Sequence, residues 1–130
     1  MSAPARDSTG AVREPGRVDV TDLKPGDCLV AIPEDTSDVS AVDATPCTNA
    51  HRVEVFATFD LPGGEYPGVS QARQLADDGC GRRVPTIGST AGGKLDLYYV
   101  YPQKRSWSLG DRSVTCFVAT STPVTSKIVP

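Results

Sequence analysis

Long apolar runs and clustered positive charge are both missing from this sequence of 130 residues. No run of about 18 apolar residues is present to cross a bilayer, and residues 1–20 lack the apolar core of a signal peptide. The formal net charge is -3 and no Lys/Arg cluster is longer than Arg82-Arg83, so no positive field attracts nucleic acid. We therefore expect no nucleic-acid partner. We also expect that the chain is part of a longer protein and meets a membrane only through a helix outside it.

Sequence signatures of common active sites are missing as well. The chain has no phosphate loop, no G-x-S-x-G elbow and no H-E-x-x-H pair. Residues 34–38 are acidic but lack the residue order of a calcium-binding loop. The adjacent carboxylates of Asp77 and Asp78 point in different directions on a helix, so they cannot work as a pair. We expect no enzymatic activity, no catalytic residue and no cofactor.

Four cysteines are present, Cys28, Cys47, Cys80 and Cys116, and none forms a C-x-x-C pair. This spacing disfavours zinc-ribbon and thioredoxin-like sites, which need closely paired thiols. Of the three possible disulfide pairings, we favour Cys28 with Cys47 and Cys80 with Cys116, because each joins near neighbours. Such bonds persist in oxidising compartments, so the sequence predicts an extracytoplasmic domain.

The single histidine, His51, leaves three interpretations open. With Cys47 it has a C-x3-H spacing, which could contribute to a metal site if two other cysteines joined it. It could instead activate Cys47 as a nucleophile, which requires a free thiol. The simplest interpretation is a histidine at the start of a strand that hydrogen-bonds a backbone carbonyl. We predict no metal site.

Hydrophobic periodicity predicts strands at 51–60, 95–101 and 113–119, with shorter ones at 28–32 and 39–43 joined by a turn over 33–38. In the strand at 51–60, Val53, Val55, Ala57 and Phe59 are expected to share one face. Spacing of three and four residues predicts one helix over 70–80, with Ser70 as its N-cap and Gly79 and Gly81 at its end. The fold class is therefore α+β, a small strand-rich domain of about five to six mainly antiparallel strands with one short helix and two disulfides.

The two ends of the chain differ in composition from its middle. Residues 1–19 are rich in small and turn-forming residues and are expected to be a disordered lead, and 20–120 the folded domain. Residues 121–130 are expected to be a tail or an edge strand. Two Gly-Asp pairs, at 26–27 and 110–111, precede apolar cysteine-bearing segments and are expected to be turns.

Aromatic residues gather in the third quarter of the chain, where alternation is expected to bury Tyr99 and Tyr101 and to leave Tyr98 outside. Tyr98 and Trp107, with His51, are the candidate residues for binding a partner.

Four short motifs in a fixed order carry a family resemblance. They are GDC at 26–28, PC-x3-H-x2-EVF at 46–56, the lone Cys80, and W-x2-GD-x4-C at 107–116. In this order, over about residues 21–119, the chain resembles the septum formation domain of actinobacterial envelope proteins. The resemblance implies an extracytoplasmic domain tethered by one transmembrane helix, two disulfides within the domain, and a link to cell division or cell-wall growth. It carries over no catalytic residue.

The leading hypothesis is therefore a non-enzymatic, monomeric interaction module that binds an envelope protein or a cell-wall component. One alternative is a thiol-dependent enzyme or redox protein that uses Cys47 with His51. The other is a structural spacer, for which no surface side chain matters.

Overall fold

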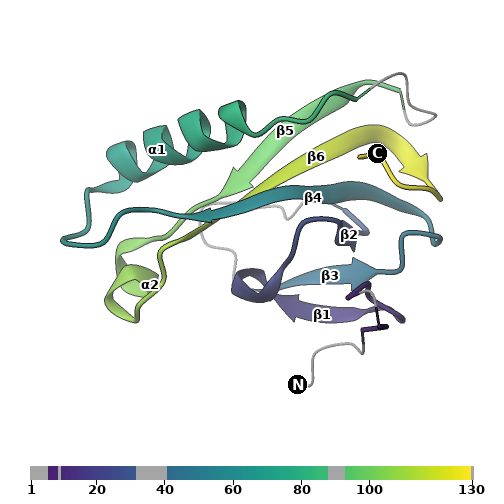
Figure 1. The fold of residues 1–130 in the computed structure, drawn as a ribbon, viewed down its shortest axis with the longest axis horizontal. Coiled ribbons are helices and arrows are strands. Elements are labelled where there is room, and N and C mark those ends of the chain that lie inside the picture. The colour runs from purple at the N-terminus through teal and green to yellow at the C-terminus, as the bar shows by residue number, and fades with distance from the viewer. Residues whose placement is uncertain (1–5, 9, 32–40, 88–92, 130) are drawn as a thin grey trace.

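A single sheet organises the chain in the computed structural model, which describes residues 6–8, 10–31, 41–87 and 93–129 (Figure 1). The sheet has six strands in the order β1-β3-β2-β4-β6-β5, and every neighbouring pair is antiparallel. The elements are β1 (Gly16–Asp19), the 3-10 helix η1 (Val20–Asp22), β2 (Cys28–Leu29), β3 (Ala41–Thr45), β4 (His51–Asp60), α1 (Val69–Arg82), β5 (Leu95–Val100), α2 (Lys104–Ser108) and β6 (Ser113–Val124). The predicted α+β class is confirmed, and α2 is a second helix that the sequence did not predict.

The central pair of strands, β4 and β6, separates two apolar clusters. Alternation along β6 places Phe117 in one cluster, with residues of β1, β2 and β3, and Cys116 in the other, with residues of α1. A register shift between Val55 and Ala57 of β4 moves Ala57 into the second cluster. The prediction that residues 53, 55, 57 and 59 share one face is therefore wrong beyond Val55.

Helix α1 covers the second apolar cluster with small residues. Ala72, Ala76 and Cys80 are buried against β6, and this close approach is possible because their side chains are short. The helix begins at Val69, after Gly68, and no side chain caps it, so the prediction of Ser70 as N-cap is wrong. It also continues through Gly79 to Arg82, because Gly79 packs beneath the ring of Phe59 instead of ending the helix.

The early hairpin forms as predicted, with β2 antiparallel to β3, while its turn at 33–38 lies outside the described residues. Most of the glycine-rich loop at 88–93 lies outside them too. Both Gly-Asp pairs are turns, since Gly26 and Gly110 have φ of 97° and 99°, a region that favours glycine. None of the described helices is long and apolar enough to span a membrane.

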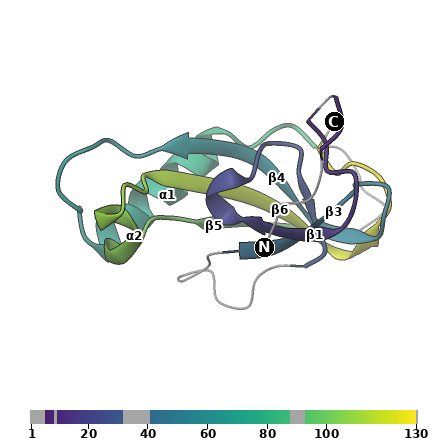
Figure 2. The ribbon, with the colours of Figure 1, turned by 90° about the horizontal axis from the view of Figure 1, so that it is seen from below.

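Both chain ends contain folded segments. Strand β1 pairs with β3, and Val12 and Val18 enter the first apolar cluster, so part of the predicted disordered lead is folded. At the other end β6 continues to Val124, and Ile128 is buried. Figures 1 and 2 place the two helices toward one end of the molecule and β1 and β3 toward the other.

Candidate functional site

Both predicted disulfides are present, Cys28–Cys47 and Cys80–Cys116, and no cysteine is free. The first joins β2 to the turn between β3 and β4, and the second joins α1 to β6. A nucleophilic Cys47 requires a thiol, whereas its Sγ is bonded to Cys28 in this structure.

Glu54 is a fully buried carboxylate beside the first disulfide. It lies opposite Cys28 in the pairing of β2 with β4, and its exposed fraction is 0%. Oε2 accepts hydrogen bonds from the backbone N–H groups of Ile128, at 2.6 Å, and Val129, at 3.4 Å, and Oε1 forms an ion pair with Lys127. A buried charge is tolerated where it is paired and hydrogen-bonded, so the last residues of the chain satisfy Glu54.

His51 is buried at the start of β4, with an exposed fraction of 0%. Its Nδ1 lies 2.7 Å from the carbonyl oxygen of Asn49, which confirms the interpretation that it hydrogen-bonds a backbone carbonyl. Its Nε2 is buried and has no hydrogen-bond partner among the described residues. A ring nitrogen of His51, a carboxylate oxygen of Glu54 and Sγ of Cys28 all lie within 4.8 Å of one another.

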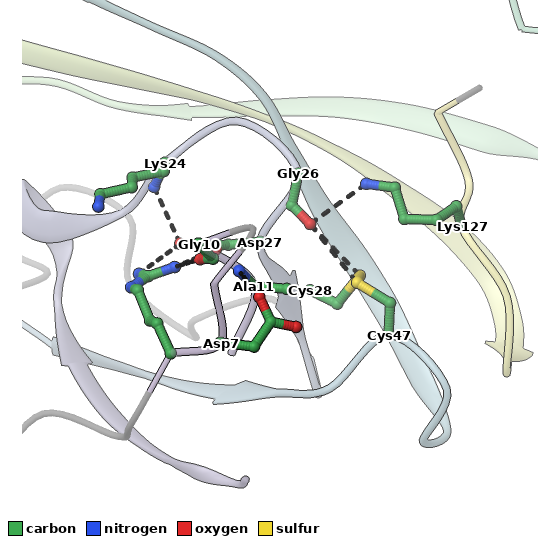
Figure 3. Close-up of polar contacts among 10 residues, drawn as sticks. Asp7, Gly10, Ala11, Lys24, Gly26, Asp27, Cys28, Cys47 and Lys127 are labelled. Carbon is green, nitrogen blue, oxygen red and sulfur yellow. Dashed lines mark hydrogen bonds and ion pairs between the residues drawn. A yellow bond between two sulfur atoms is a disulfide. The ribbon is translucent and has the colours of Figure 1, made fainter. Parts of the chain in front are cut away.

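The carbonyl oxygen of Gly26 links the disulfide to the chain end. Nζ of Lys127 donates to it at 3.2 Å, and Sγ of Cys47 lies 3.4 Å from it (Figure 3). We call Gly26, the Cys28–Cys47 bond, His51, Glu54 and Lys127 the buried polar cluster. Sequence reasoning found its cysteines and His51 but missed Glu54 and Lys127, because no local pattern relates positions so far apart.

Asp27, next to this cluster, ties the N-terminal segment to the domain (Figure 3). Its carboxylate accepts two hydrogen bonds from Arg6, at 2.7 and 2.9 Å, and one from the backbone N–H of Lys24. The hydrogen bond to Asp27 raises the pKa of the Arg6 guanidinium, against the opposing effect of burial.

A second group of side chains, which we call the aromatic cluster, comprises Tyr66, Tyr99, Tyr101 and Trp107. Trp107 is buried and has a structural role: its Nε1 donates to the carbonyl of Gly64 at 3.0 Å. Arg112 stacks 3.7 Å from the centroid of its indole ring, and Tyr66 meets that ring edge to face at 5.6 Å. Trp107 is therefore unavailable as a surface contact.

The tyrosines of the cluster are only half-buried. Tyr99 and Tyr101 lie side by side, with ring centroids 6.0 Å apart, and a hydrogen bond to Tyr99 raises the pKa of Arg73 on α1. Desolvation, and then the charge of Tyr101, raise the pKa of Tyr66. Tyr98 was predicted to lie outside the core. It packs instead against the first apolar cluster, which contains Phe117.

The three candidate binding residues therefore do not share a surface: His51 and Trp107 are buried, and Tyr98 lies on the other face of the sheet from Tyr99. The partly exposed side chains of the aromatic cluster include Tyr66, which was not among the candidate binding residues.

The family model for septum formation matches residues 25–129. The chain belongs to the septum formation family. The matched region of this septum formation domain contains both disulfides, the buried polar cluster and the aromatic cluster, whereas Arg6 and β1 lie before it. Comparison with curated proteins and with solved structures found no significant match.

Family membership gives this septum formation domain a role related to septation. Two disulfides fit an extracytoplasmic location, because such bonds persist where the environment is oxidising.

Proposed function

We propose that the chain is a non-enzymatic, monomeric interaction module of a membrane-anchored envelope protein, and that it binds an envelope protein or a cell-wall component during septation. The family assignment supports the link to septation, and the disulfides support the compartment.

The observation that carries the proposal is the half-exposed tyrosine group beside α1. Tyr66, Tyr99 and Tyr101 lie with Arg73, and tyrosine and arginine are enriched among residues that dominate binding energy. Tyrosine supplies a large contact area and a hydroxyl while ordering few side-chain torsions.

The tyrosine group stands on a rigid part of the fold. The Cys80–Cys116 bond fixes α1 to β6, and Tyr99 lies opposite Cys116 in the pairing of β5 with β6. Two large apolar side chains near these elements are exposed, Val69 at the start of α1 at 55% and Leu109 after α2 at 81%. A preorganised surface loses less entropy when it binds.

The thiol-dependent alternative has less support, because it requires reduction of the bond between Cys28 and Cys47 before Cys47 could attack. The spacer alternative differs from the proposal in one respect: it gives Tyr99 and Tyr101 no role beyond folding.

The test is a double variant, Tyr99→Ala/Tyr101→Ala, expressed in cells whose septation depends on the full-length protein. We expect a folded domain, shown by circular dichroism, that fails to restore septation. The matched control is Tyr98→Ala, a tyrosine of the same strand on the other face of the sheet. It is expected to lower stability without abolishing septation. Normal septation with the folded double variant would contradict the proposal and favour a spacer.

A further inference from the structure

The buried polar cluster contains two features that the interaction role does not explain. Nε2 of His51 is buried without a partner among the described residues, and Oε1 of Glu54 is held only by the long, half-exposed side chain of Lys127. A ring nitrogen of His51 and a carboxylate oxygen of Glu54 lie within 4.8 Å of Sγ of Cys28. Unpartnered buried nitrogens are rare enough to need an explanation.

We propose that the Cys28–Cys47 disulfide conceals a zinc site. When a dithiol reduces this bond, the two thiolates join His51 and Glu54 as four ligands of Zn²⁺. The inference does not depend on the proposed interaction role.

Distances favour such a site. Zn²⁺ takes sulfur ligands at about 2.3 Å and nitrogen or oxygen ligands at about 2.0 to 2.2 Å, so its ligand atoms are roughly 3.3 to 3.8 Å apart. The ligand atoms of Cys28, His51 and Glu54 are already within 4.8 Å of one another. Convergence of at most about 1 Å would bring these three atoms to the separations that zinc ligands have. Cys47, now bonded to Cys28, is the fourth ligand.

The protonation of His51 suits a metal ligand. The Asn49 carbonyl can only accept a hydrogen bond, so Nδ1 carries a proton and Nε2 is the ring nitrogen left to bind a metal. Metal-binding histidines commonly donate their other N–H to a backbone carbonyl, which fixes the ring and its tautomer.

A cation already lies against Glu54. The ammonium of Lys127 pairs with Oε1 and donates to the carbonyl of Gly26, and its side chain is 46% exposed. It can therefore swing into solvent when a metal takes its place. No comparable group of ligands surrounds the Cys80–Cys116 bond in the described part of the chain.

Two electrons and two protons pass from the dithiol to Cys28 and Cys47, which become thiols, while the dithiol becomes a disulfide. Zn²⁺ then binds both sulfurs as thiolates and releases two protons to solvent. The turn between β3 and β4, which carries Cys47, would thus be held to β2 either by a covalent bond or by a metal.

The experiment uses the full chain and Co²⁺ as a spectroscopic substitute for Zn²⁺. The protein is reduced with dithiothreitol, freed of reductant without oxygen, and titrated with Co²⁺. We expect thiolate-to-cobalt charge-transfer and tetrahedral d–d absorption at one equivalent, displaced by Zn²⁺, and none from the disulfide-bonded protein. His51→Gln should bind Co²⁺ at least tenfold more weakly. Lys127→Met should bind Co²⁺ about fivefold more tightly, because the half-exposed ammonium no longer competes with the metal for Glu54.

Cys80→Ser/Cys116→Ser is the matched control and should keep the spectrum, whereas Cys28→Ser/Cys47→Ser should lose it. If reduction unfolds the chain, metal addition should refold the parent and not His51→Gln, because binding is then coupled to folding. A spectrum unchanged in His51→Gln would overturn the proposal. So would a reduced parent that neither binds nor refolds with Co²⁺.

Discussion

The carboxylate of Glu54 in β4 accepts a hydrogen bond of 2.6 Å from the backbone N–H of Ile128, 74 positions along the chain. This bond, with the ion pair to Lys127, closes the end of the chain over the buried polar cluster. The side chain of Ile128 is buried with Val118 and Val124, so polar and apolar contacts hold the segment together.

We expect Glu54→Ala to lower the free energy of unfolding by about 1 to 3 kcal/mol, because the N–H of Ile128 would lose its acceptor. Lys127→Met should cost less, about 1 kcal/mol, since water reaches the ammonium. Urea unfolding with the disulfides intact measures both. Equal stability of Glu54→Ala and the parent would show that the hydrogen bond from Ile128 to Glu54 contributes nothing.

Gly79→Ala should destabilise the domain by about 1 to 3 kcal/mol, because the added Cβ would overlap the ring of Phe59. Gly81→Ala is the control in the same helix: its Cβ would meet no atom within 4 Å, and alanine should stabilise the helix by up to about 1 kcal/mol. Thermal unfolding of the two variants side by side compares them. Similar melting temperatures would contradict the packing of Gly79 on Phe59.

The two disulfides should differ modestly in their contribution to stability. They span 19 and 36 positions, so the chain-entropy model gives about 3 kcal/mol for Cys28–Cys47 and about 4 kcal/mol for Cys80–Cys116. Replacing each pair with serine and measuring urea unfolding tests this order. A much larger loss of stability from replacing Cys28 and Cys47 would indicate that the bond also holds the other members of the buried polar cluster in place.

Stability should fall at alkaline pH through Tyr66. Burial raises its pKa above 10.0, so the folded protein keeps the phenol protonated to a higher pH than the unfolded chain does. The contribution is present below pH 10.0 and is lost as the pH rises toward the folded-state pKa. Urea unfolding across this range should show a steeper decline for the parent than for Tyr66→Phe. Identical slopes would exclude Tyr66 as the cause.

The sequence predicted the elements with a strong period. Strand β4 and helix α1 were found because their apolar residues recur at spacings of two and of three to four. Helix α2 was missed, since five residues are too few to show a period, although Gln103 and Ser106 form a capping box there.

Of the candidate site, the cysteines and His51 could be predicted from the sequence, whereas Glu54 and Lys127 could not. Cysteine pairing follows from few alternatives, and the motif around His51 marked it as special. The partners of Glu54 lie at the far end of the chain, and nothing local to Lys127 indicates a buried carboxylate. Simple alternation also fails to predict the faces of β4 after Val55, because it assumes regular pairing and the register shifts there.

The two disulfides also determine how the domain would bear a mechanical load. A pull on the two chain ends would pass through Cys28–Cys47 and bypass the backbone of β3, then through Cys80–Cys116 and bypass β5 and α2. Those elements would carry no tension while the bonds last. The force would fall on β1, β4, α1, the last part of β6 and the contacts of Ile128, and the domain would extend far less than its backbone length allows.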